Sequence, residues 1–224
     1  MNSLKNYQKT EKYPVYYPAF INLKNKKTVV VGGGDIAERK VLSLLKAEAD
    51  VTVISPVITK RLEKKASDGK IIHISRKYRK GDIKNYFLVI AATDDREVNE
   101  RIAKEAKCLV NVVDTPQLCN FIVPSIVKRG HLIIAISTGG ISPAMSRTIR
   151  KEIEAHYKKE FQQFLKSLKL IRGKAFKHIR DNKKRTEFLK YAGSKTILAL
   201  LRNKGCKTTI NVLKNKFDKY CGNR

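Results

Sequence analysis

Residues 29–37 of the chain, Val-Val-Val-Gly-Gly-Gly-Asp-Ile-Ala, decide the fold around them. The valines end a β-branched run, and apolar residues recur at helical spacing after the glycines, which predicts a strand, a tight turn and a helix. Residues 32–37 fit the pattern G-x-G-x-x-A in that setting. Its first glycine permits the turn, its second lets the backbone approach a pyrophosphate, and its small last residue lets the helix pack closely on the sheet. We expect a dinucleotide site here, and a purely structural glycine turn is the alternative.

The elements that follow alternate between strand and helix. Further strands are expected at residues 51–54, 70–75, 86–92 and 109–113, and helices at about 59–66 and 97–106, the second capped by Asp94 or Asp95. Alternation at this pitch favours a parallel sheet with right-handed crossovers. We predict an α/β fold, a Rossmann-like doubly wound parallel sheet over residues 18–120, preceded by a polar lead at residues 1–17.

The pattern changes after residue 120. Two short apolar strands at residues 122–127 and 132–137, joined through Lys128-Arg129-Gly130, predict a hairpin, and a helix is expected from Pro143 to about Tyr157. Beyond residue 158, apolar residues at helical spacing continue among many lysines. We therefore expect a small α+β dimerisation segment at 121–157 and a basic helical C-terminal domain at 158–224.

Composition limits the class of protein. The chain is 42% hydrophobic, enough for a packed core, and no apolar run approaches the roughly 18 residues of a spanning helix. Its start has no apolar targeting segment, so a cytoplasmic protein with no membrane partner is expected. The four cysteines lack disulfide or zinc spacing and the four histidines are scattered, so no metal site is predicted. The net charge of +28 by itself favours a polyanionic partner: nucleic acid, an acidic membrane, or a polycarboxylate or phosphate ligand.

The end of the second expected strand bears on the choice between NAD and NADP. A carboxylate there would grip the adenosine ribose of NAD, but the strand ends Ile54-Ser55-Pro56-Val57. Lys60 and Arg61 follow and are candidates to accept a 2′-phosphate, although surface residues of the next helix would look the same. The residues by themselves leave the two cofactors open.

Two further stretches carry polar groups to the expected binding edge. Asp114, in Asn-Val-Val-Asp-Thr-Pro, follows the fifth strand at the edge where open α/β sheets bind ligands, and an acid there can exchange protons with a substrate. A turn-forming aspartate is the alternative. Residues 137–143, Ser-Thr-Gly-Gly-Ile-Ser-Pro, offer hydroxyls and amides to carboxylates, or Ser142 simply caps the helix that starts at Pro143.

The succession VVVGGGDIAERK, AATDD, NVVDTPQLCNFIVPSIVKRG and IAISTGGISPAMSRTIRKEIE closely resembles the amino-terminal module of siroheme synthases, which is precorrin-2 dehydrogenase with or without sirohydrochlorin ferrochelatase activity. The resemblance covers roughly residues 16–157. It implies NAD-dependent oxidation of precorrin-2 to sirohydrochlorin, with Fe²⁺ as a further substrate in bifunctional members. It also implies a homodimer built through residues 121–157, and an active site between the nucleotide domain and the rest.

The resemblance also assigns residues. Asp114 becomes the catalytic acid, and the family's use of NAD without a strand-end carboxylate makes NAD the expected cofactor. Thr138 falls where some members carry a serine that is phosphorylated. The expected cofactor-binding residues are Gly32, Gly33, Gly34, Asp35, Ile36, Ser55, Pro56, Val57 and Thr93, and the expected substrate-binding residues are Thr138, Gly139, Ser142, Arg129, Arg147 and Arg150.

The expected chemistry agrees with the charge. Precorrin-2 carries eight carboxylates, so a basic protein would attract it, and arginines pair well with such groups. The principal rival is a non-catalytic dinucleotide-sensing module whose basic tail, +15 over residues 151–224, binds nucleic acid. That tail shows no recognition motif, and a lysine-rich surface explains its charge more simply. A different dehydrogenase on the same nucleotide fold is a second rival, but such an enzyme would not need the motifs NVVDTP and STGGISP at these positions.

Overall fold

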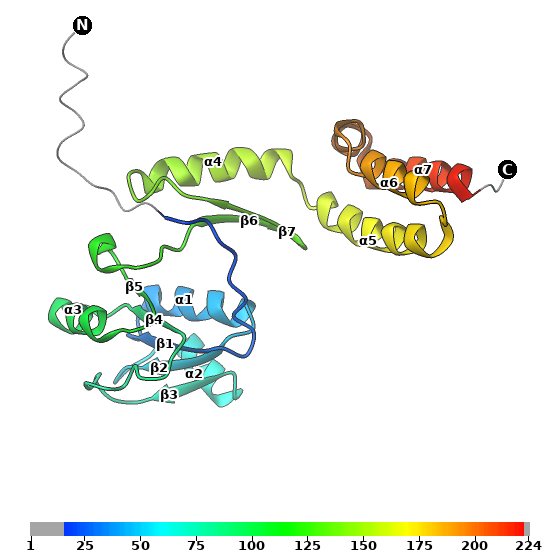
Figure 1. The fold of residues 1–224 in the computed structure, drawn as a ribbon. Helices are drawn as coiled ribbons and strands as arrows, with labels where there is room; N and C mark the ends of the chain where they lie inside the picture. Colours follow the sequence, from blue (N-terminus) through cyan, green and yellow to red (C-terminus); the bar gives the residue numbers. More distant parts are fainter. Residues whose placement is uncertain (1–15, 222–224) are drawn as a thin grey trace, which may run out of the picture. The chain divides into compact units, whose positions relative to one another are not determined.

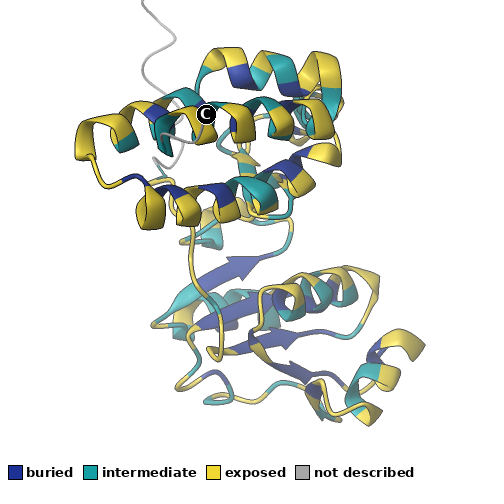
Figure 2. Ribbon diagram, turned by 90° about the vertical axis from the view of Figure 1, so that its right-hand side faces the viewer, coloured by how far each residue is buried: buried dark blue, intermediate teal, exposed yellow. Residues whose placement is uncertain are grey.

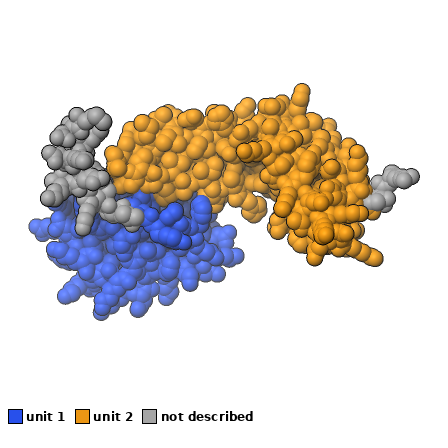
Figure 3. Space-filling model, turned by 45° about the horizontal axis from the view of Figure 1, so that its top comes forward, with its two compact units in different colours: residues 1–123 blue, residues 124–224 orange. Residues whose placement is uncertain are grey.

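The computed structural model describes residues 16–221, which divide between Val123 and Pro124 into two compact units (Figure 3). The polar lead expected at residues 1–17 lies outside the described residues except for its last two. The units are described one at a time below.

The first unit is built on a five-stranded parallel sheet (Figure 1). Its strands are β1 (Lys27–Val31), β2 (Asp50–Ile54), β3 (Ile71–Ile74), β4 (Leu88–Ala91) and β5 (Leu109–Val112). The order is β3-β2-β1-β4-β5, so the chain runs outward from β1 to β3 and then crosses back to β4. The predicted doubly wound sheet is confirmed, and its switch point lies at the carboxyl ends of β1 and β4.

Helices cover both faces of this sheet. Helix α1 (Asp35–Lys46) and helix α2 (Lys60–Ser67) pack into one core cluster, and α3 (Arg96–Glu105) packs into the other through Ile102. The central strands are buried on both sides, as the dark blue arrows of Figure 2 show. Burial on both faces explains why their sequences are continuous apolar runs and not alternating ones.

Several boundaries differ from those expected. The third and fourth strands, expected at 70–75 and 86–92, are shorter, because β3 pairs with β2 only over Ile71–Ile74 and β4 pairs with β1 only over Leu88–Ala91. Helix α2 begins one residue late because Thr59 caps it, with its hydroxyl oxygen accepting a hydrogen bond from the amide of Leu62 at 3.3 Å. Of the two aspartates expected to cap α3, Asp95 does so.

The second unit opens with an antiparallel hairpin, β6 (Ser125–Arg129) and β7 (Leu132–Ile136). The expected strand at 122–127 is displaced toward the C-terminus. Proline cannot donate to a strand ladder, so the ladder starts only after Pro124, and the turn tightens until Arg129 pairs with Leu132.

Four helices follow, α4 (Pro143–His156), α5 (Glu160–His178), α6 (Asn182–Ala192) and α7 (Lys195–Cys221). The last three pack around Phe164, Phe188 and Leu213, and α7 is kinked at Gly205, whose φ is 76°. Among residues 16–221 we find no helix with the length and apolar character needed to cross a membrane.

Candidate functional site

A cleft of about 850 Å³ opens in the first unit beside the glycine turn. It lies at the carboxyl ends of β1, β2 and β4, the edge at which open α/β sheets bind ligands. The structure brings together around it all nine residues expected to bind the cofactor: Gly32, Gly33, Gly34, Asp35, Ile36, Ser55, Pro56, Val57 and Thr93. Residues from three separate stretches of sequence therefore line one cleft.

Two of the glycines are required by close backbone contacts. Gly32 has a φ of 121°, and a Cβ there would lie 2.2 Å from the carbonyl oxygen of Ala92. A Cβ on Gly33 would lie 1.9 Å from the carbonyl oxygen of Val57 and 2.7 Å from the hydroxyl of Ser55. Real Cβ atoms do not approach other atoms this closely, so the turn can pass between β2 and β4 only as glycine.

The amino end of α1 is left open toward the cleft. Gly34 is the cap residue, with extended φ and ψ, and it has no side chain to accept hydrogen bonds from the first helical turn. Helices α2 and α3 are capped by Thr59 and Asp95. The first amides of α1 have no partner within the helix, and the helix dipole adds partial positive charge, so this end suits a phosphate.

The stretch after β2 forms one side of the cleft. The hydroxyl of Ser55 donates to the carbonyl oxygen of Val57 at 2.7 Å, which holds the turn that touches Gly33. Glu38 of α1 accepts a hydrogen bond from Thr59 at 2.6 Å and pairs with Arg61 at 3.3 Å. Arg61, a candidate for a 2′-phosphate, is thus already paired with a carboxylate.

The opposite side includes three residues that the sequence motifs did not indicate, Lys77, Tyr78 and Val98, and two that were expected only as helix caps, Asp94 and Asp95. The hydroxyl of Tyr78 donates to Glu105 at 2.5 Å, and burial, followed by this bond, raises the pKa of the tyrosine. The same carboxylate accepts from the amide of Gly81 at 2.5 Å. These bonds fix the connection from β3 to β4, which carries no periodic pattern and so gave no signal in the sequence.

Asp114 stands just beyond β5, at the same edge of the sheet, but it is not among the residues that line the cleft. Its φ is 56°, in the left-handed region. The half-buried Lys40 of α1 lies within the field of Asp114. Burial and the neighbouring Arg39 lower the pKa of Lys40, and the negative charge of Asp114 partly opposes this. A carboxylate and an amine therefore share this end of the sheet.

The six residues expected to bind substrate lie in the second unit. Around α4, Ser142 caps the helix by accepting from the amide of Met145 at 3.1 Å, and the hydroxyl of Thr138 bonds with both the amide and the carbonyl oxygen of Ser142. Gly139 has a φ of 66° and donates its amide to the hydroxyl of Ser137 at 3.0 Å. These donors have partners within their own turn.

The three arginines differ in how they are held. Arg129 donates to the carbonyl oxygen of Tyr157 at 2.7 Å, and Arg150 pairs with Glu154 one turn along α4 at 3.4 Å. Arg147 is exposed, and its side chain makes one long bond, 3.4 Å, to the carbonyl oxygen of Pro143. Arg147 is accordingly the most available of the three for an anionic ligand.

Two family models match the chain. Residues 19–125 match a model described as putative NAD(P)-binding, and residues 129–156 match one described as sirohaem biosynthesis protein, central. The expected cofactor is thereby confirmed at the level of an NAD(P)-binding domain.

Curated relatives and a solved structure agree with these models. The chain is 47% identical over 140 residues to a siroheme synthase from Methylobacillus flagellatus and 45% identical over 143 residues to one from Ruthia magnifica. The matches cover 61% and 62% of this chain, and the chain spans about 30% of the length of each relative. A solved structure titled "SirC, precorrin-2 dehydrogenase" matches with a TM-score of 0.77 and 25% identity, over 89% of this chain and 100% of that one. Residues 19–156 are therefore similar, in two family models and in the curated relatives, to the siroheme-synthase amino-terminal modules that the motifs resemble.

Proposed function

We propose that the chain catalyses the NAD-dependent dehydrogenation of precorrin-2 to sirohydrochlorin. The observation that carries the proposal is the open cleft at the glycine turn, in a chain whose fold matches a precorrin-2 dehydrogenase over the full length of that protein. The siroheme-synthase relatives support the same step.

The cleft fits a dinucleotide by its own geometry. Gly33 lets the turn pass against the carbonyl oxygen of Val57, where any side chain would collide, and the first amides of α1 are the donors that would hold a pyrophosphate. Pro56 and Val57 would lie against the adenosine, and Thr93 would lie on the β4 side. When bound, the nicotinamide supplies a hydride acceptor. NAD is preferred over NADP in this proposal because neither Lys60 nor Arg61 lines the cleft and Arg61 is paired with Glu38.

Substrate capture follows from charge. An octacarboxylate is attracted by a protein of net charge +28, and guanidinium groups bind carboxylates in a bidentate manner. We assign carboxylate binding to Arg147 first, then to Arg129 and Arg150, whose present partners would have to be exchanged. Thr138, Gly139 and Ser142 are also proposed to bind carboxylates, and their present hydrogen bonds would likewise have to be exchanged. Positioning two large rings is the main task of such an enzyme.

Asp114 is the proposed proton acceptor. The dehydrogenation removes a hydride and a proton from the macrocycle, so a base is needed besides the nicotinamide. Asp114 follows β5, next to β4, whose end lines the cleft. A carboxylate in a left-handed turn projects from the strand end instead of continuing the ladder, and this makes it available to a ligand.

A homodimer is the proposed assembly. On the hairpin, Ile126 and Ile133 are 42% and 40% exposed, on the face opposite the buried Val127. Exposed apolar residues on a two-stranded sheet are suited to pack against a second copy. The cytoplasmic location and the lack of a membrane partner stay predictions.

Insertion of Fe²⁺ into sirohydrochlorin has no structural observation in its favour. In residues 16–221 there is no group of three or more His, Cys, Asp and Glu side chains that could hold a metal ion. A chelatase needs to bind its metal substrate only transiently, so this activity stays a prediction from the resemblance, and the assay below includes it.

The test is anaerobic incubation with precorrin-2 and NAD, following NADH and the sirohydrochlorin spectrum. Wild type should form both products, and Asp114→Asn should lower kcat by about a hundredfold or more, the usual contribution of a general base. Asp68→Asn, at the exposed end of α2, is the matched control and should retain wild-type kcat. Fe²⁺ added afterwards tests the second activity. If the wild type binds NAD but forms no product, the assignment fails, and a salt-dependent shift with duplex DNA would then favour the nucleic-acid rival.

A further inference from the structure

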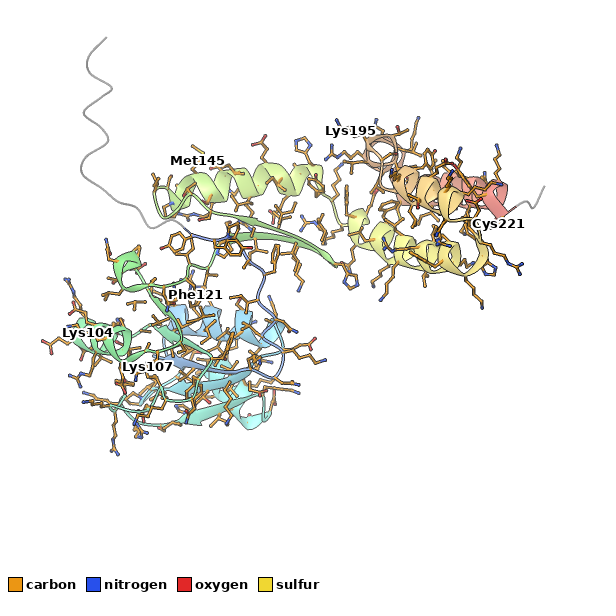
Figure 4. All side chains as sticks on the ribbon, in the orientation of Figure 1. Lys104, Lys107, Phe121, Met145, Lys195 and Cys221 are labelled. Carbon is orange, nitrogen blue, oxygen red and sulfur yellow. The ribbon has the colours of Figure 1, made fainter. Side chains whose placement is uncertain are left out.

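The chain that leaves β5 folds back along the outer edge of that strand. β5 is the last strand of the sheet, so the backbone groups of its outer edge need partners. At Val110 they are supplied by Asn120, whose side-chain oxygen accepts from the amide at 2.7 Å and whose own amide donates to the carbonyl oxygen at 3.1 Å. One residue further on, the side-chain amide of Asn111 donates to the carbonyl oxygen of Phe121, which packs on the core (Figure 4).

At Val112 the partner is a thiol. The sulfur of Cys119 accepts from the amide of Val112 at 3.1 Å and lies 3.3 Å from the carbonyl oxygen of the same residue; its single S–H can donate to this oxygen or to that of Thr115. The sulfur is also 3.4 Å from the carbonyl oxygen of Thr115 and 3.5 Å from the side-chain amide of Asn111. One side chain thus takes the place that a neighbouring strand would fill.

These contacts lie on both sides of Asp114 in the chain. Val112 precedes it by two residues and Thr115 follows it directly, so Cys119 ties together both arms of the turn that carries the carboxylate. The backbone bond across this turn, from the amide of Thr115 to the carbonyl oxygen of Val112, is long at 3.4 Å. A left-handed conformation at a non-glycine residue costs about 1 kcal/mol or more and persists only where the surroundings hold it.

We propose that Cys119 is a positioning residue for Asp114, because its sulfur holds Val112 and Thr115 and thereby keeps the carboxylate in its left-handed conformation at the strand end. The inference rests on the proposed role of Asp114 in the dehydrogenation. Cys119 itself does not touch substrate or cofactor and acts only through the aspartate.

The electrostatic surroundings support a neutral thiol in this role. Burial raises the pKa of Cys119, and the hydrogen bond from the amide of Val112 and the charge of Lys40 only partly oppose this. The sulfur therefore keeps its proton at neutral pH and can accept from the amide of Val112 while it donates to the carbonyl oxygen of Thr115, as a bridge between the two requires. Lys40, the charged group that acts on the thiol, also lies within the field of Asp114.

The chain offers a matched control. Cys108 is also half-buried, at the start of β5, but its sulfur makes only a long contact, 3.8 Å, to the carbonyl oxygen of the next residue. Substitution of Cys108 removes a thiol of similar burial from the same unit without touching the turn at Asp114.

The experiment compares steady-state kinetics of Cys119→Ala, Cys119→Ser and Cys108→Ala with precorrin-2 and NAD. Misplacing a reacting group by a fraction of an ångström lowers the rate by about tenfold or more, so Cys119→Ala should lower kcat to that degree. KM for NAD should stay unchanged, since neither Cys119 nor Asp114 lines the cleft. Cys119→Ser, which keeps a donor and an acceptor, should recover most of the rate, and Cys108→Ala should match wild type. In an Asp114→Asn background, Cys119→Ala should change kcat no further.

Each result decides the matter. Wild-type kcat in Cys119→Ala, or an equal loss in the serine and alanine variants, overturns the inference while the proposed function stands. Loss of NAD binding together with kcat in Cys119→Ala would show a general structural role and overturn the inference as well. In that case the volume-matched Cys119→Val decides. If Cys119→Val binds NAD but has a low kcat while Cys119→Ser is active, the inference stands. An inactive wild type, or a fully active Asp114→Asn, removes the proposed function or the role of Asp114 instead.

Discussion

The chain contains two units in which a strand leads through a glycine turn into a helix, and they use their polar groups differently. In the first, β1 passes through residues 32–34 into α1, whose first amides meet no capping side chain. In the second, β7 passes through residues 137–142 into α4, where Thr138 and Ser142 bond within the turn and to the helix end. The same local pattern gives an open end in one case and a self-capped end in the other. A glycine turn therefore predicts a ligand site only when its own side chains leave the helix amides free.

The largest effect is expected when the open turn is blocked. Gly33→Ala places a Cβ 1.9 Å from the carbonyl oxygen of Val57, so the wall of the cleft must shift. We expect NAD binding to weaken by at least about tenfold and stability to fall by about 1–3 kcal/mol, the usual cost of overpacking. NAD titration and urea unfolding measure the two effects.

Gly34→Ala is the matched control for this substitution. A Cβ on Gly34 meets no atom within 4 Å, so this variant should keep the stability of wild type in urea. An equal loss of stability in the two alanine variants would show that the collision with Val57 is not the cause.

A smaller effect is expected when the open helix end is given its own cap. Gly34 already has the extended conformation of a capping residue, so the hydroxyl in Gly34→Ser can accept from the first turn of α1. Stability should rise by about a few tenths of a kcal/mol while NAD binding weakens, because the amides now have an internal partner. The turn before α1 would then be capped by its own side chain, like the turn before α4. Unchanged affinity for NAD would contradict the proposal that the first amides of α1 bind the ligand.

The smallest effect is expected at the second turn. Ser142→Ala removes the side chain that accepts from the amide of Met145, which should lower stability by about 1 kcal/mol. Thr148→Ala, which removes an exposed hydroxyl bonded to the preceding turn of α4, should change stability little. Thermal unfolding compares the two. NAD binding should be unaffected in both, and a loss of binding in Ser142→Ala would mean that the two turns are not independent.

Much of the fold and of the cofactor site could be predicted from local pattern. The β-branched run and the glycines at residues 29–34 determine a strand and a turn by sterics within a few residues, and all nine cofactor candidates do line one cleft. The strand expected at 122–127 starts later than its apolar run indicates, because Pro124 and the pairing of Ser125 with Ile136 determine where the ladder begins.

Other features have no local signal. Tyr78 reaches the cleft because Glu105, 27 residues away, accepts its hydroxyl, and Cys119 meets Val112 because the chain reverses after β5. Neither residue belongs to a periodic pattern or a spacing rule. Such contacts depend on long-range packing, which a reading of neighbouring residues cannot supply.

The sequence by itself determined the alternation of strands and helices and the glycine turn, because these depend on side-chain volume, backbone freedom and periodicity over short distances. Only the tertiary structure decided which polar groups are still free to bind a ligand. Arg61 is paired with Glu38, Thr138 is engaged within its own turn, and the first amides of α1 are open. The physical reason is that a hydrogen-bonding group is available to a ligand only if no other part of the chain satisfies it first.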